Sequence, residues 1–136
     1  MNLAEGAAIF ARMGILYEAG IHDGLEKACV IIETEAKSYP GEYQKGWASL
    51  QPATIAQKST GDSPLLETGE MRDSIEHQVE GHSGFVGSDN DKAVWQELGT
   101  SRIPPRSFLG LAAQTKAEES ANTLGDVLFK KMIGRE

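Results

Sequence analysis

The fold is decided by residues 65–113, whose four informative stretches read LLETGEMRDSIEHQV (65–79), GFVGS (84–88), DKAVWQELGT (91–100) and IPPRSFLGLAA (103–113). From Ser74 to Glu80, polar and apolar side chains alternate, which is the period of a half-buried strand. The glycine-rich GHSG that follows is typical of a turn, so the next apolar residues return antiparallel. The sequence therefore predicts a β-hairpin over about 74–88, preceded by a short turn that Thr68 is placed to cap.

Two helices are expected after the hairpin. Asn90 and its acidic neighbours are cap residues for a helix over 91–98, which Gly99 would end in the usual left-handed conformation. The apolar side of that helix is expected to be Val94, Trp95 and Leu98. Beyond Pro104 and Pro105, Ser107 is a candidate cap for a final helix with an apolar stripe at steps of three and four. The stripe comprises Leu109, Ala113, Ala117, Ala121, Leu124, Leu128 and Met132.

The segment before residue 41 has helical spacing of its apolar residues. Glycines weaken it, each costing roughly 1 kcal/mol against alanine, so we expect two helices over about 3–20 and 24–38. Pro40-Gly41 should end the second helix. Residues 41–64 are predicted to be a flexible loop anchored by Trp47 and Leu50, with a short helical turn after Pro52. The expectation is a single α+β domain over 1–136, a small antiparallel sheet flanked by N-terminal and C-terminal helices.

Length, composition and charge limit the classes of protein to which the chain can belong. A chain of 136 residues with 40% hydrophobic and 24% charged residues is typical of one soluble globular domain. No apolar run approaches the ~20 residues that span a bilayer, no signal peptide is evident, and one cysteine (Cys29) suits a reducing compartment, so cytoplasmic synthesis is expected. The whole net charge of −7 resides in residues 62–97, which carry nine acids and two bases. This acidity argues against tight binding to phosphate backbones.

Known catalytic and metal-binding patterns fail on specific residues. The GHSGF stretch (81–85) has phenylalanine where a nucleophile elbow needs glycine. The acids from Asp89 onward lack the sixth-position glycine and twelfth-position glutamate of a calcium loop. None of the three histidines has a partner at metal-ligand spacing, and a partly buried, hydrogen-bonded role is expected for His77. We expect no enzyme activity, no catalytic or metal residues and no cofactor.

Several pieces in order resemble a known family. They are Trp47, Leu50, Thr54, Lys58, LETGEM (66–71), Ser74-Ile75, Val86-Gly87-Ser88, Ala93, ELGT (97–100) and PRSFL (105–109). Their order and spacing, over roughly residues 28–113, is similar to the tail-completion or head–tail joining proteins of long-tailed bacteriophages and prophages, also called the virion morphogenesis family. The chain departs from the family at Ser107, where proline is usual, and at Trp95, where a smaller or tyrosine-like residue is expected.

The resemblance implies a non-enzymatic virion protein. Such proteins form rings that cap the tail tube and dock to the head connector, so a homo-oligomer, of about six subunits, is expected. The partners implied are the tail tube protein and the connector or stopper protein. The location implied is the tail or neck of the virion, after assembly in the bacterial host cytoplasm. A small non-enzymatic protein-binding or regulatory module is the alternative.

Two sets of residues are candidates for this role. Acidic side chains that face a channel would repel DNA and let it slide, and the candidates for such a lumen are Glu76, Glu80, Asp89 and Asp91. An ordinary solvated strand face is the competing interpretation. The second set, a partner or subunit interface, comprises Trp95, Arg102 and Arg106. The Pro104–Phe108 segment has two open roles, which are to fix the entry of the last helix and to present its arginines to an acidic partner.

Overall fold

The computed structural model describes residues 2–58, 60–66 and 69–134, which leaves the cap expected at Thr68 outside the described residues. The elements are α1 (Leu3–Ser38), α2 (Pro52–Gln57), α3 (Glu70–Asp73), β1 (Glu76–Glu80), β2 (Ser83–Gly87), α4 (Asp91–Leu98), α5 (Leu109–Thr115) and α6 (Ala117–Met132). The two strands pair antiparallel. The predicted class is confirmed: the chain is α+β, with a small sheet between a long N-terminal and a C-terminal helix.

The first helix is continuous, so the predicted division at 20–24 is wrong. A Cβ atom at Gly20 would lie 2.7 Å from Leu128 Cδ1, and one at Gly24 would overlap the side chain of Leu124. These glycines let α6 approach the backbone of α1 closely instead of breaking the helix. Asp23, which lies between the two predicted helices, forms an ion pair with Lys131 of α6 at 3.3 Å.

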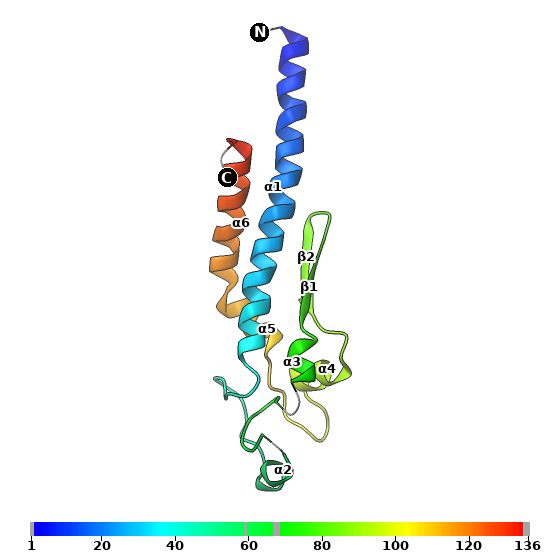
Figure 1. The fold of residues 1–136 in the computed structure, drawn as a ribbon, viewed down its shortest axis with the longest axis vertical. Helices are drawn as coiled ribbons and strands as arrows, with labels where there is room; N and C mark the ends of the chain where they lie inside the picture. Colours follow the sequence, from blue (N-terminus) through cyan, green and yellow to red (C-terminus); the bar gives the residue numbers. More distant parts are fainter. Residues whose placement is uncertain (1, 59, 67–68, 135–136) are drawn as a thin grey trace.

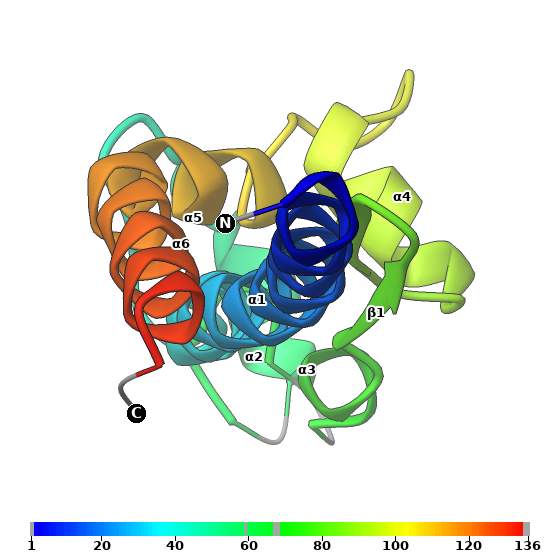
Figure 2. The same cartoon turned by 90° about the horizontal axis from the view of Figure 1, so that it is seen from above.

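The hairpin and α6 lie on different sides of α1, as the view along the helix shows (Figure 2). The hairpin register runs from Glu76 opposite Gly87 to Glu80 opposite Ser83. Gly84 allows β2 to sit against α1, because a Cβ there would lie 2.6 Å from Cys29 Sγ. Cys29 is buried.

A small core lies at the foot of α1, where the hairpin, α4 and α5 meet. Its buried members are Ala36, Tyr39, Met71, Ile75, Ala93, Phe108 and Ala112. Trp47 packs against this cluster, and its indole N–H donates to the backbone oxygen of Ser107 at 2.9 Å. Trp47 is therefore the anchor that the sequence indicated. Proline at the first position of α2 opens the predicted helical turn.

Helix α4 has the predicted bounds, with the Asn90 side chain accepting from the Lys92 N–H at 2.9 Å. Its predicted apolar side is wrong. Ala93 is the residue that α4 buries, whereas Val94, Trp95 and Leu98 are about half to three-quarters exposed. The helix touches the core through one small residue, so its large apolar side chains remain on the surface.

The predicted single C-terminal helix is two helices, which meet at Lys116. The expected stripe is correct at Leu124, Leu128 and Met132, which are partly buried. It is wrong at its alanines, because Ala112 and Ser120 face inward instead of Ala113, Ala117 and Ala121. The bend at Lys116 changes which face of the chain meets α1.

The N-terminal end of α1, here called the projecting segment, extends beyond both the hairpin and α6 (Figure 1). From Leu3 to Leu16 the helix rises about 20 Å, and its side chains are almost all exposed. Among the described residues, no helix combines the length and apolarity that crossing a bilayer requires.

Candidate functional site

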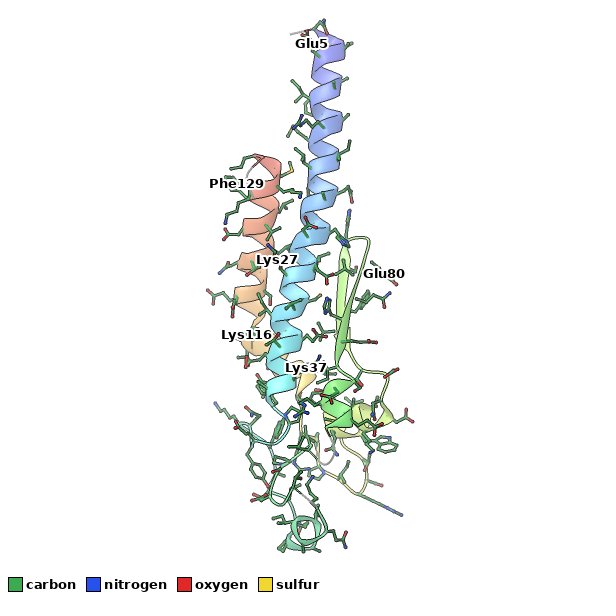
Figure 3. All side chains as sticks on the ribbon, viewed as in Figure 1. Glu5, Lys27, Lys37, Glu80, Lys116 and Phe129 are labelled. Carbon is green, nitrogen blue, oxygen red and sulfur yellow. The ribbon has the colours of Figure 1, made fainter. Side chains whose placement is uncertain are left out.

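The outer face of the hairpin is acidic. Glu76, Gln78 and Glu80 are exposed, while His77 and Val79 alternate with them and face α1. Figure 3 shows Glu80 on the side of the hairpin away from α1. The structure thus brings two of the predicted lumen residues together on one solvent-facing strand surface.

The other two predicted lumen residues lie elsewhere. Asp89 and Asp91 are exposed and, with Trp95, rim a shallow hollow at the start of α4. Trp95 is 49% exposed, and its contact with a partner stays a prediction. The acidic set is therefore divided into a hairpin pair and an α4 pair.

The inner face of the hairpin is held to α1 by His77. Its ring nitrogens contact the carboxylates of Glu26 and Glu33, the latter at 3.2 Å. The hydrogen bond that the His77 ring donates to the Glu26 carboxylate raises the pKa of His77 above its ordinary value, against the opposing effect of burial. The predicted satisfied, partly buried role of His77 is confirmed, and it fixes which face of the hairpin is free.

The start of α5 is capped by a side chain from another helix. One oxygen of the Glu97 carboxylate accepts from the backbone N–H groups of Phe108 and Leu109 at 3.0 and 2.7 Å, and the other accepts from the Ser107 hydroxyl. The predicted role of Ser107 as the helix cap is therefore wrong, because α5 has no cap from its own flanking residue. Glu97 performs that function and joins the end of α4 to the core.

Arg106 is buried, with 5% of its surface exposed. Its Nε donates to the backbone oxygen of Ala48 at 2.9 Å, and its Nη2 to that of Ser49 at 3.3 Å. The expected surface position of Arg106 is wrong, because its side chain is buried and ties the 41–64 loop to the chain. A contact of Arg106 with a partner stays a prediction. Arg102 is exposed.

Arg102 and Arg106 both line a hollow of about 350 Å³ at the foot of the molecule. It lies between the 48–58 segment, the start of α3, one side of α4 and the 102–106 segment. Its charged lining residues are Lys58, Lys92, Arg102, Arg106 and Glu70. Sequence reasoning missed this hollow, because its basic residues are scattered over nearly fifty positions.

The described residues contain no group of three or more His, Cys, Asp or Glu side chains arranged to hold a metal ion. The Cys29 thiol has its pKa raised by burial first and by Glu26 and Glu33 second, which opposes formation of the nucleophilic thiolate. The features that the described side chains do form are the acidic outer face of the hairpin and the basic hollow.

Comparison with protein-family models, with curated proteins and with solved structures finds no match to this chain. The class that the structure itself defines is a helical α+β chain with a two-stranded sheet, a small core and one projecting helix.

Proposed function

We propose that this chain is a structural assembly protein of the virion, which completes the phage tail tube and joins it to the head connector as a ring subunit. The observation that carries the proposal is the projecting segment of α1. An apolar helix surface that the chain's own fold leaves uncovered is typical of a protein–protein contact. A subunit of a larger assembly would bury this surface against its neighbour.

The projecting segment of α1 is rich in large apolar side chains. Leu3 is 91% exposed, Phe10 75% and Ile15 70%, and Ile9 and Met13 are also exposed. Only Glu5 and Arg12 carry charge between residues 3 and 17, so this segment is neutral in a chain of net charge −7. Neutrality makes it the surface on which two copies of an acidic chain can meet without repulsion.

The projecting segment also continues a packed interface. Gly20 and Gly24 face α6, where leucines fill the space above them. Steps of three and four toward the N-terminus place Met13, Phe10 and Gly6 on the same face of the helix. A Cβ at Gly6 would meet nothing within 4 Å. The spacing is that of a helix-packing seam, and α6 fills only its lower part. A helix of a neighbouring subunit fits the rest.

Sedimentation velocity on variants of the projecting segment tests this surface. Phe10→Glu combined with Met13→Glu should lower the association constant at least about tenfold, because each apolar side chain contributes about 1.5–3 kcal/mol when buried. Ile15→Glu is the control, since Ile15 is about as exposed as Phe10 but lies on the opposite side of the helix. If the double variant associates as the unaltered chain does, the seam is not the subunit contact.

We further propose that the acidic outer face of the hairpin lines the ring and repels DNA. Glu76 and Glu80 project from the face that α1 does not cover. Phosphates passing such a surface would be repelled and would not be held. Asp89 and Asp91 lie apart from this face, at the start of α4, and are a second acidic pair that the lumen would have to include. Trp95 and Arg102, both exposed, are then candidates for contact with the tube or the connector.

Charge reversal tests the lumen. Rings carrying Glu76→Lys and Glu80→Lys should bind duplex DNA more tightly than unaltered rings, with a steeper dependence on salt. Glu118→Lys with Asp126→Lys makes the same change of charge on exposed positions of α6. Equal DNA binding by both double variants would place Glu76 and Glu80 on an ordinary solvated face.

A small non-enzymatic binding or regulatory module is the second candidate, favoured by the basic hollow at the foot of the molecule. The genes beside the coding sequence distinguish the two functions. Capsid, connector and tube genes are expected on either side of an assembly gene, whereas regulatory genes would favour the module.

A further inference from the structure

We infer that the basic hollow at the foot of the molecule binds the carboxylate of an acidic peptide segment. The inference does not rest on the proposed virion role, because the hollow is defined by this chain alone. Its central group is Arg106, a guanidinium that the fold buries without a counter-charge. Its hydrogen bonds go to neutral backbone oxygens, so a bound anion would supply the counter-charge that the described residues do not.

The hydrogen-bonding capacity of Arg106 is only partly used. The guanidinium has five N–H donors. Two of them reach the backbone oxygens of Ala48 and Ser49. No ion pair of Arg106 is present within the described ranges, so its remaining donors have no carboxylate partner there. A carboxylate accepts such donors in pairs, with a strength about twice that of neutral hydrogen bonds.

The rim of the hollow is also positive. Lys92 and Arg102 are exposed at its edge, and Lys58 donates to the backbone oxygen of Leu66 at 2.6 Å inside it. Glu70 is the one acid in the lining, so four of the 13 basic residues of the chain are gathered here. On a chain of net charge −7, this concentration of positive charge favours an acidic ligand over a basic one.

Two features favour a peptide over a small inorganic anion. Gln96 lines the hollow, and its Oε1 is buried without a hydrogen-bond donor. A peptide N–H would supply that donor, whereas inorganic phosphate at neutral pH offers mainly acceptors. The walls also include the apolar residues Leu50, Leu65, Met71 and Ile103, which suit an apolar side chain next to the acid.

Nuclear magnetic resonance titration of the full chain with capped dipeptides tests the inference. N-acetyl-Leu-Asp-amide should shift the Arg106 Nε–H and the Gln96 side-chain amide signals in a saturable manner. N-acetyl-Leu-Asn-amide, which lacks the charge, should bind at least about tenfold more weakly. Inorganic phosphate is the third probe. If it binds as tightly as the acidic dipeptide, or if neither dipeptide binds, the inferred peptide site is refuted.

The second part of the test replaces exposed basic residues at the edge of the hollow, because replacing the buried Arg106 would disturb the fold. Lys92→Gln with Arg102→Gln should weaken the acidic dipeptide at least about tenfold while leaving the melting temperature unchanged, since both side chains are exposed. Lys27→Gln with Lys130→Gln removes the same charge from exposed positions between α1 and α6. Equal losses in both double variants would mean that net charge, and not the hollow, attracts the peptide.

Discussion

Replacing Glu97 by alanine should destabilise the chain more than any other single exposed or half-exposed acid. Glu97 is the group through which α4 holds the start of α5, and no flanking residue of α5 replaces it. Its removal leaves the N–H groups of Phe108 and Leu109 without an acceptor. Phe108 is fully buried, so water cannot take over the lost hydrogen bond there.

The magnitude follows from these two N–H groups. A buried donor without a partner costs about 1–3 kcal/mol, and losing a helix cap costs about 0.5–2 kcal/mol. Leu109 is only partly buried, so its N–H is partly rehydrated. The expected loss in unfolding free energy for Glu97→Ala is therefore about 2–4 kcal/mol. For a chain of this size it corresponds to a fall in melting temperature of about 6–20 °C.

Chemical denaturation monitored by circular dichroism measures the loss. Glu97→Gln keeps an oxygen that accepts from the same N–H groups, so it should cost only about 1 kcal/mol. Glu42→Ala, at an exposed loop position, should stay within about 0.5 kcal/mol of the unaltered chain. If Glu97→Ala is no worse than Glu42→Ala, the carboxylate does not cap α5 and the reasoning fails.

Two further predictions concern the faces of α1. Because the pKa of His77 is raised in the folded chain, its stabilising contribution is complete below about pH 6.5 and is lost as pH rises through the folded value. The difference in unfolding free energy between the unaltered chain and His77→Gln should shrink from about pH 5.5 to about pH 8.5, and a constant difference in denaturant titrations would contradict the Glu26 contact. Gly24→Ala should destabilise by about 1–3 kcal/mol, because its Cβ overlaps Leu124. Gly14→Ala, with open space around it, should stabilise by up to about 1 kcal/mol, and the same sign for both changes in calorimetry would refute the close approach of α6.

Local patterns predicted much of the fold. The alternation around Ile75, His77 and Val79 gave the hairpin and its buried face, because a strand with one solvated side must alternate. Asn90 and Gly99 gave both ends of α4, since caps act within a few residues of the helix they end. The class followed from these short-range signals.

The errors arose where the deciding contact is distant in sequence. Gly20 and Gly24 resemble helix breakers, and their role in admitting α6 depends on leucines about a hundred positions away. The buried face of the C-terminal helices depends likewise on the bend at Lys116. A periodic pattern shows that a helix has a face, but the partner determines which face is buried.

For the candidate sites, the sequence predicted which side chains are exposed but not which contacts the buried ones make. Glu76 and Glu80 fall on the exposed strand face that alternation requires. Trp95 is about half exposed, although the helical pattern placed it on the apolar side of α4. The burial of Arg106 was not foreseeable, because its acceptors are backbone oxygens of Ala48 and Ser49, and backbone oxygens leave no trace in the residue types. The same holds for the basic hollow.

The mass of the chain in solution tests the central claim, self-assembly into a ring, most directly. Multi-angle light scattering across a range of concentrations, with and without tail tube protein, is the measurement. The account predicts a ring of about six subunits, either alone or on contact with the tube protein. A chain that remains a monomer in both conditions, or a stable dimer that gains no mass when tube protein is added, would contradict it.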